Sequence, residues 1–218
     1  MKRTRWTKLG AAILTAAMLT GTAGANTISY ITSTPITSAT TDWTRSLPFQ
    51  KFSPTLGTLD SVEIKLQGGL STVLTVTNGS ASGSSGNAYT HLQFTVQDPG
   101  AYLNAPEIDI MSPKFTYTLA SGGSTTSGTL NKNGSSDDLY TLAAILAEFT
   151  GSGTIPLSAS TFTETLLANT GGNTSAGQIT QAQLTGTVIY SYTVPEPATL
   201  SLLAAGGLST FLLRRRRR

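Results

Sequence analysis

The chain contains no cysteine and a single histidine, His91. The absence of cysteine excludes disulfide bonds, thiolate metal sites and cysteine nucleophiles. One histidine cannot supply the ligand set of a zinc site, and no Gly-x-Ser-x-Gly sequence is present to position a serine nucleophile. We therefore predict no catalytic residue, no metal site and no cofactor, and a fold stabilised by a hydrophobic core alone.

Charged residues are also scarce, at 11% of the 218 residues, and most of the basic ones lie near the two ends. Nine of the 14 Lys and Arg residues fall within residues 1–8 and 214–218. Residues 26–193 retain five basic and ten acidic residues, which gives this part of the chain a net charge of −5. Nucleic acid is therefore not an expected partner, because phosphate contacts require clustered Lys or Arg side chains.

Residues 1–25 have the three parts of a signal peptide. The basic residues of the first part are Lys2, Arg3, Arg5 and Lys8. An apolar segment over residues 9–20 follows, and then Ala23 and Ala25 supply the small residues that a signal peptidase recognises. The sequence predicts export through the inner membrane and a mature chain that begins at Asn26.

Residues 194–218 combine three features in order. The first is the processing motif Val194, Pro195, Glu196 and Pro197, whose prolines keep the backbone extended and accessible. Residues 198–213 are uncharged and mostly apolar; as a helix they would measure about 24 Å, less than a hydrocarbon core of roughly 30 Å. The last five residues are Arg214, Arg215, Arg216, Arg217 and Arg218. Snorkelling of these arginines can make up the difference, so we predict a transmembrane helix over 198–213 with a cytoplasmic stop signal.

This arrangement resembles the PEP-CTERM sorting signal of Gram-negative bacteria. The resemblance covers residues 194–218 and implies recognition by an exosortase-type membrane protease. That protease would cut near Pro195–Pro197 and release the preceding domain to the outer surface or the exopolysaccharide matrix. The alternative is an ordinary tail-anchoring helix, which would leave the Pro-Glu-Pro sequence without a role.

Residues 26–193 alternate in hydrophobicity and are rich in residues that favour strands and turns. Ser and Thr account for 53 of these 168 residues. Apolar and polar residues alternate at Val62–Leu66, Leu92–Val96, Phe115–Leu119 and Leu184–Tyr192. Period-two patterns are typical of half-buried antiparallel strands, so we predict an all-β fold with one antiparallel β-sandwich over residues 26–193. The predicted turns are Gln67–Gly69, Asn78–Ser80, Ser121–Gly123, Asn133–Gly134 and Gly171–Asn173.

One segment, Asp137–Phe149, does not alternate. Ser135 or Ser136 can cap a helix here. The apolar stripe of that helix would be Leu139, Leu142, Ala143 and Leu146. We predict a short helix that connects two strands over an open end of the sandwich.

The stretch Phe52–Leu66 resembles the choice-of-anchor E family, in which a Phe-x-Pro-x-Leu-Gly-Thr-Leu run leads into a strand. Further similar blocks are Asp42–Thr44, Phe149–Thr154 and Gly186–Thr193. The resemblance implies a surface domain of a kind that carries alternative C-terminal anchors, and it assigns no catalytic residue. In physical terms, Pro54 and Gly57 predict a turn. We expect the side chains of Leu56, Leu59 and Val62 to pack into the core and hold the following strand in place.

Few residues remain as candidates for chemistry. His91 has the parity of Gln93, so it should project from the polar face of its strand. Glu107 and Asp109 lie two residues apart, which places them on one side of a strand at about 6.6 Å. A solvated strand face is the first interpretation of this pair, and paired glycosidase carboxylates or part of a calcium site is the alternative. Three aromatic residues are candidates for stacking on sugar rings or for the core: Trp43, Tyr89 and Tyr102.

The sequence as a whole predicts an exported, non-enzymatic cell-surface or exopolysaccharide-matrix protein. Its expected partners are a signal peptidase, an exosortase-type protease, the inner membrane during sorting, and exopolysaccharide. The alternative is a carbohydrate-binding module or glycan-active enzyme that uses the surface carboxylates Glu107 and Asp109.

Overall fold

The computed structural model describes residues 25–30 and 36–194, which all lie within one compact unit, Gly24–Pro195. Ala25, one of the two predicted cleavage-site residues, is the first residue of strand β1 (Ala25–Tyr30). The rest of the predicted signal peptide, the motif from Pro195 onward, the predicted helix over 198–213 and the five arginines lie outside the described residues. Within the described ranges, no helix is long and apolar enough to cross a membrane.

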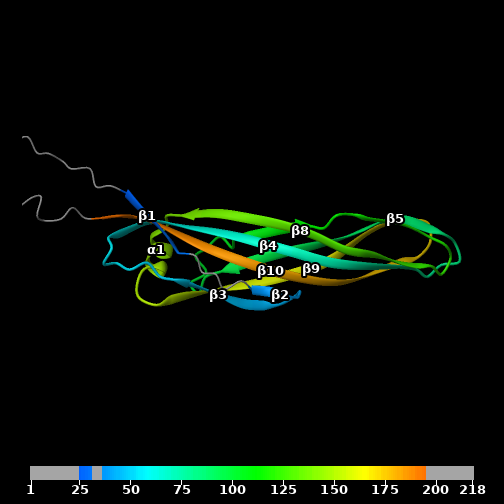
Figure 1. Cartoon of the computed structure of the whole chain (residues 1–218), viewed down its shortest axis with the longest axis horizontal. Helices are drawn as coiled ribbons and strands as arrows, with labels where there is room; N and C mark the ends of the chain where they lie inside the picture. Colours follow the sequence, from blue (N-terminus) through cyan, green and yellow to red (C-terminus); the bar gives the residue numbers. More distant parts are fainter. Residues whose placement is uncertain (1–24, 31–35, 195–218) are drawn as a thin grey trace, which may run out of the picture. The chain divides into compact units, whose positions relative to one another are not determined.

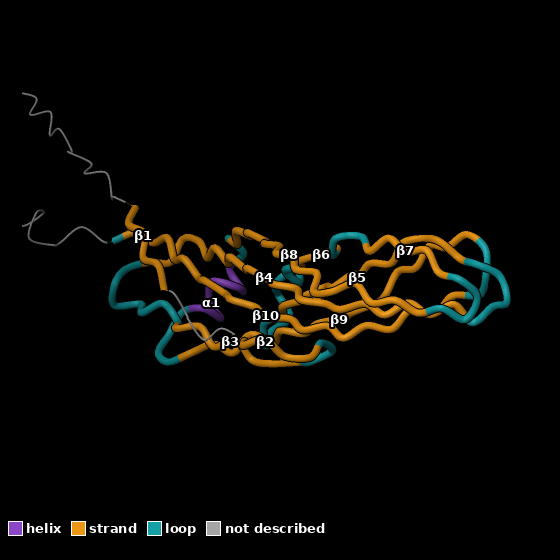
Figure 2. The backbone as a smooth tube through the Cα atoms, turned by 45° about the vertical axis from the view of Figure 1, so that its right-hand side comes forward, coloured by secondary structure: helices purple, strands orange, loops and turns teal. Residues whose placement is uncertain are grey.

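The strands form two antiparallel sheets, sheet A and sheet B, that pack face to face (Figure 1, Figure 2). Sheet A contains β1, β2 (Ile36–Thr40), β4 (Thr58–Asn78), β8 (Ser124–Tyr140) and β10 (Thr174–Thr193). Sheet B contains β3 (Thr44–Gln50), β5 (Ser84–Gln97), β6 (Glu107–Met111), β7 (Phe115–Leu119) and β9 (Thr154–Thr170). The predicted antiparallel β-sandwich is confirmed.

Strand pairing centres on β4 and β10 in sheet A and on β5 and β9 in sheet B. In sheet A, β4 lies between β10 and β8, while β1 and β2 both pair with the other edge of β10. In sheet B, β9 lies between β3 and β5, while β6 and β7 both pair with the other edge of β5. Among the connections between the two sheets, residues 79–83 link β4 to β5, residues 120–123 link β7 to β8 and residues 171–173 link β9 to β10.

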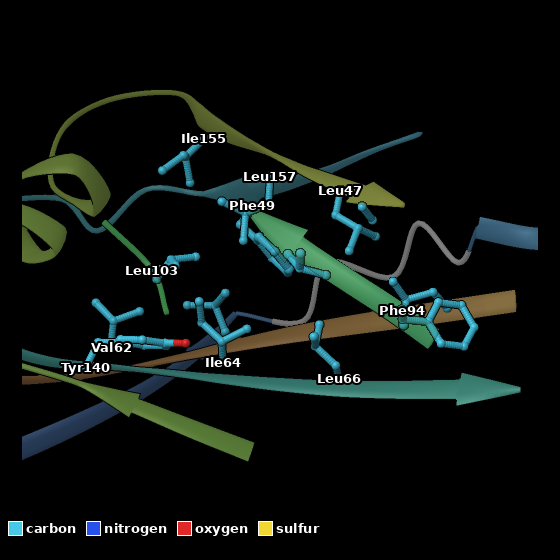
Figure 3. Close-up of a cluster of buried hydrophobic side chains, with 14 of the residues drawn as sticks. Leu47, Phe49, Val62, Ile64, Leu66, Phe94, Leu103, Tyr140, Ile155 and Leu157 are labelled. Carbon is cyan, nitrogen blue, oxygen red and sulfur yellow. The ribbon is translucent and has the colours of Figure 1, made fainter. Parts of the chain in front are cut away.

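The predicted alternation determines which side chains form the core. Val62, Ile64 and Leu66 of β4 are fully buried, as are Leu92 and Phe94 of β5. Figure 3 shows the β4 residues directed toward buried side chains of sheet B. Removal of this apolar surface from water is the main term that stabilises the fold, since no covalent cross-link is present.

A cluster of buried threonine side chains crosses the core. It separates a larger apolar cluster, which includes Leu70, from a smaller one, which includes Leu74. The Thr72 hydroxyl oxygen of β4 lies 3.0 Å from that of Thr90 on β5 and 2.7 Å from that of Thr180 on β10. The Gln178 Oε1 atom accepts hydrogen bonds from Thr90 at 3.1 Å and from Thr180 at 3.2 Å. Because every hydroxyl in the cluster has a partner, its burial is tolerated, and the cluster joins the two sheets.

The predicted turns at Gln67–Gly69 and Asn133–Gly134 are wrong, because both segments lie within long strands. Gly68 faces the core, where a Cβ atom would lie 2.7 Å from the Phe94 ring. Gly134 also faces the core, and a Cβ atom there would lie 2.7 Å from Cγ2 of Ile108. These glycines therefore make room for large side chains of the opposite sheet.

The predicted helix is confirmed only in its second half, as α1 (Ala143–Phe149). Residues up to Tyr140 instead extend β8, where Asp137 pairs with Lys65 of β4 and its Oδ2 atom accepts a hydrogen bond from Lys65 Nζ at 3.0 Å. No serine caps the helix, whose N-cap is Leu142, and Leu139 and Leu142 are exposed. Cross-strand pairing with β4 therefore outweighs the helical preference of the first residues.

Helix α1 covers one end of the core, as predicted. Its buried residues are Ile145 and Phe149, and Figure 1 shows it at the end of the sheets where β4 begins. The Phe149 carbonyl oxygen accepts a hydrogen bond from the Phe52 backbone N–H at 2.8 Å, and the Phe52 carbonyl oxygen accepts one from Gly151 at 2.9 Å. The helix and the segment before β4 thus close this end of the sandwich together.

The predicted turn at Pro54–Gly57 is confirmed, with the Leu56 N–H donating to the Ser53 carbonyl oxygen at 3.1 Å. Gly57 has φ +150°, and a Cβ atom there would collide with the Thr193 carbonyl oxygen, so the position requires glycine. Leu59 and Val62 are buried as predicted. Leu56 is 36% exposed, so the prediction that its side chain packs into the core is wrong.

At the opposite end of the two sheets, Asn78 holds together the connections formed by residues 79–83, 120–123 and 171–173. Its side-chain Nδ2 donates to the carbonyl oxygens of Ser82 at 2.7 Å and Ala120 at 3.0 Å. Its Oδ1 accepts from the Ser80 backbone N–H at 3.1 Å. The Gly79 N–H next to it donates to Asn173 at 2.8 Å. The predicted turns at Asn78–Ser80, Ser121–Gly123 and Gly171–Asn173 all meet here and are confirmed.

Substitution Asn78→Ala should lower the free energy of unfolding by about 2–4 kcal/mol, because it leaves several enclosed backbone groups without partners. Urea unfolding followed by tryptophan fluorescence measures this loss. Asn87→Ala is the matched control, since Asn87 lies on the outer face of β5. Its side-chain amide forms no hydrogen bond with any described residue. An equal loss in the two variants would contradict the role assigned to Asn78.

Candidate functional site

The outer face of sheet B brings several of the predicted site residues together. His91 projects outward from β5, as predicted, between β6 and β9. Its Nδ1 atom lies 2.9 Å from Oε1 of Glu164, and its Nε2 atom lies 3.0 Å from Oδ1 of Asp109. Hydrogen bonding to Glu164 raises the pKa of His91, against the lowering effect of burial, and the Asp109 carboxylate raises it further. When His91 is protonated, both ring nitrogens donate hydrogen bonds and the side chain connects three strands.

Glu107 and Asp109 lie on the same exposed side of β6, as predicted, but each has a separate partner. Glu107 Oε2 accepts a hydrogen bond from Gln93 Nε2 at 3.2 Å, whereas Asp109 contacts His91. Within residues 25–30 and 36–194, no group of three or more acidic or histidine side chains is arranged to hold a metal ion. The carboxylates thus serve as cross-strand partners on this face.

The three candidate aromatic residues do not form one platform. Trp43 is partly buried and its ring meets Phe94 edge-on at a centroid distance of 6.1 Å, so it belongs to the core. The Lys114 ammonium lies 5.7 Å from the Tyr89 ring centroid on the outer face of sheet B. Tyr102 is 49% exposed in the loop after β5. Phe162 of β9, which the sequence did not single out, is 57% exposed beside Gln93.

A second carboxyl pair, Glu148 and Asp98, joins helix α1 to the loop after β5. Asp98 accepts hydrogen bonds from the backbone N–H groups of Tyr102 at 2.9 Å and Leu103 at 3.0 Å. Burial alone would raise the pKa of Asp98, but the hydrogen bond with Glu148 and those from the backbone lower it overall. Asp98 thus stabilises the loop that follows β5.

Glu148 titrates in the opposite direction. Its Oε1 atom accepts a hydrogen bond from the Gly100 N–H at 2.9 Å, while Oε2 is enclosed and faces no donor. Burial raises the pKa of Glu148 to about 7, and hydrogen bonding to the Asp98 carboxylate contributes to this rise. Below that pH, Glu148 carries the proton and is uncharged beside the Asp98 carboxylate.

The raised pKa of Glu148 makes stability depend on pH. In the unfolded chain the carboxyl loses its proton near 4.5, whereas in the folded chain it does so near 7. The contribution of Glu148 to the free energy of unfolding is therefore fully present below pH 4.5 and is lost as the pH rises through about 7. Since the side chain is partly exposed, we expect a loss of about 1 kcal/mol rather than the full value of the shift.

Thermal unfolding at about pH 5 and about pH 8 tests this dependence. Glu148→Gln keeps a hydrogen-bond donor near Asp98 and removes the titration, so the variant should lose less stability between the two conditions than the wild type. Glu107→Gln, a neutralised carboxylate on the exposed side of β6, is the matched control. The assignment is wrong if Glu148→Gln and the wild type respond equally to pH.

The processing motif follows directly after sheet A. Strand β10 ends at Thr193, whose backbone pairs with Thr58 of β4 and Ala25 of β1. Val194 is 37% exposed and is the last described residue. Proline cannot donate to a strand ladder, so the following Pro195 is consistent with an end of β10 at this point. Residues 193–218 match the PEP-CTERM protein-sorting motif.

The PEP-CTERM match bears out the resemblance seen in the last residues, and it covers 26 of the 218 residues. The motif implies an exported protein that an exosortase sorts, with a C-terminal membrane anchor and delivery toward the cell surface. The motif and sheet A meet at Thr193, so cleavage after this residue leaves the backbone of β10 intact.

Other comparisons add little to the PEP-CTERM match. No curated protein matches the chain. Among solved structures, a chain of infectious bursal disease virus Gx strain is 13% identical, with 79% of this chain and 36% of that chain covered and a TM-score of 0.18. A chain of the Gt strain is 10% identical, with coverage of 98% and 53% and the same TM-score of 0.18. This chain thus spans about a third to a half of the viral chains, and likeness at this TM-score carries no argument.

Proposed function

We propose that the chain is an exported, non-enzymatic protein of the cell surface or exopolysaccharide matrix, released by an exosortase-type protease near Pro195–Pro197. The observation that carries this proposal is the PEP-CTERM match at residues 193–218, which begins where β10 ends. A signal peptidase would cut after Ala25, and the membrane would then hold the chain through residues 198–213. The C-terminal arginines keep the end of the chain on the cytoplasmic side until cleavage.

Membership of the choice-of-anchor E family is part of the same proposal. The stretch that carries the resemblance includes Phe52, which is fully buried, and Gly57, which the turn before β4 requires. The blocks Phe149–Thr154 and Gly186–Thr193 lie near it, since Phe149 bonds to Phe52 and Thr193 faces Gly57. Blocks that are separate in the sequence thus share one structural region, which supports a common domain type.

The intact mass of the protein recovered from its native cells and medium tests the proposed processing. We expect a mass that corresponds to a start at Asn26 and an end between Val194 and Pro197. A mass that includes residues 198–218 would show a retained anchor and would overturn the proposed release. Fractionation of the same cells assigns the product to the membrane, the surface or the medium.

A glycan-active enzyme or carbohydrate-binding module remains the second candidate. The observation in its favour is the outer face of sheet B, where Glu107, Asp109 and Glu164 surround His91 and Gln93 close to the exposed ring of Phe162. The double variant Glu107→Gln/Asp109→Asn separates the two candidates. Loss of sugar binding or turnover at unchanged thermal stability favours this candidate, and no change in either leaves the carboxylates as surface residues.

A further inference from the structure

Three neighbouring strands of sheet A present an uncharged polar surface on their outer side. In the middle of β4, the residues that point outward are Gln67, Gly69 and Ser71. They pair with Thr185, Gln183 and Gln181 of β10 on one side and with Ser135, Asn133 and Asn131 of β8 on the other. Figure 1 shows β8, β4 and β10 side by side, and we name these nine residues the amide groove.

The groove is hollow because its central residue has no side chain. A Cβ atom at Gly69 would lie 2.8 Å from Nε2 of Gln183 and 3.3 Å from Oδ1 of Asn133. The two amide side chains therefore lean over Gly69 from the strands on either side. A hollow of about 390 Å³ extends from Gly69 toward Gln67 and Thr185, and one of about 230 Å³ extends toward Ser71 and Gln181.

The two hollows share Gly69, Asn133 and Gln183, so they form one depression along β4. From Gln67 to Ser71 it runs for roughly 13 Å, at the usual rise per residue of a strand. This length suits an extended chain better than a compact small molecule. A combined depression of this size lies within the range of sites that bind ligands in proteins.

The amide groups of the groove are free to bind a ligand. Each Asn or Gln side chain offers two donors and one acceptor oxygen. The amides of Gln67, Asn131, Asn133 and Gln183 form no hydrogen bond with any described residue. Only Gln181 is engaged, accepting from the Ser38 hydroxyl at 3.1 Å. Four uncommitted amides on one surface can satisfy a ligand whose own surface consists of hydroxyl groups.

We propose that the amide groove binds a neutral polysaccharide chain laid along β4. Charge favours a neutral ligand, because none of the nine groove residues is ionisable and residues 26–193 carry a net charge of −5. An acidic polysaccharide would be repelled by that charge and would find no cation among the groove residues. This inference rests on the proposed function, because a surface or matrix location is what brings the groove into contact with polysaccharide.

The test uses the full chain and the exopolysaccharide of the cells that produce it, separated by anion exchange into neutral and acidic fractions. Co-sedimentation with each fraction measures affinity. Gln183→Ala/Asn133→Ala removes the two amides that meet over Gly69 and should weaken binding to the neutral fraction roughly tenfold. Gly69→Asn, which fills the floor of the groove against two flexible side chains, should weaken it similarly. The matched control is Asn87→Ala/Gln97→Ala on the outer face of sheet B.

Selective loss of binding in the groove variants, with binding kept in the control and melting temperatures unchanged, supports the inference. Equal binding by all variants, no binding to the neutral fraction, or salt-sensitive binding to the acidic fraction alone overturns it. Release into the medium is measured on the same cultures. A protein that is released but binds no neutral polysaccharide refutes the groove alone, whereas a protein that is never exported refutes the proposed function.

Discussion

A chain in which Pro195, Glu196 and Pro197 are all replaced by alanine should remain in the membrane fraction, with no processed form in the medium. The replacement removes three residues of the PEP-CTERM match, near which we propose that the protease cuts. It also replaces two prolines, which disfavour a helix, by alanine, which favours one. The predicted membrane segment and the arginines are unchanged, so the chain is still inserted but is no longer released.

Cell fractionation with an antibody to the folded domain, followed by the intact mass of each fraction, measures this effect. Glu107→Ala is the matched control, since it removes an exposed carboxylate of the same type from β6 and should leave release at the wild-type level. A second variant, Glu196→Ala alone, tests whether the carboxylate itself is recognised. Wild-type release of the triple variant would refute exosortase processing at this motif.

Substitution Phe52→Ala should lower the free energy of unfolding by about 3–5 kcal/mol, the largest stability effect we expect from a single residue of this domain. Phe52 is fully buried, and its ring lies 5.8 Å from that of Tyr190 and 5.2 Å from that of Tyr192, between centroids. Its backbone also bonds to Phe149 and Gly151. Removal of the ring leaves a cavity where α1, β10 and the turn before β4 meet.

Urea unfolding of purified protein measures this loss, with Phe162→Ala as the matched control. Phe162 is also a phenylalanine of the same domain, but it is 57% exposed on the outer face of β9. We expect its substitution to change stability by no more than about 0.5 kcal/mol. Similar losses in the two variants would show that Phe52 does not hold this end of the core. Because Phe52 lies in the stretch that resembles the choice-of-anchor E family, the same experiment gives that stretch a structural role.

Alternation along single strands was predictable because it depends on local geometry. Side chains of a strand point to opposite faces in turn, so Val62, Ile64 and Leu66 had to share a face whatever they packed against. His91 and Glu107 were placed on outer faces for the same reason, and both are there. Their partners could not be predicted, because Asp109 and Glu164 approach His91 from two other strands, at sequence separations of 18 and 73 residues.

The errors have a shared origin in contacts between distant segments. Gly68 and Gly134 have the local character of turn residues, but Phe94 and Ile108 of the opposite sheet occupy the space beside them. Asp137 has the local character of a helix start, but Lys65 of β4 pairs with it in a strand. Patterns within a single sequence do not include contacts between distant segments. Predictions from them therefore follow the local preference for a turn or a helix.

By itself, the sequence determined the alternating strands, the acidic domain and the sorting motif at residues 193–218. Each depends on residues that are neighbours in the chain, so composition and spacing are sufficient. The tertiary structure alone decided how the two sheets pack, that Glu148 rather than Asp98 has the raised pKa, and where Gln183 and Asn133 converge over Gly69. Those features arise from the register between β10, β4 and β8 and from the packing of α1, which bring together residues that the sequence separates by tens of positions.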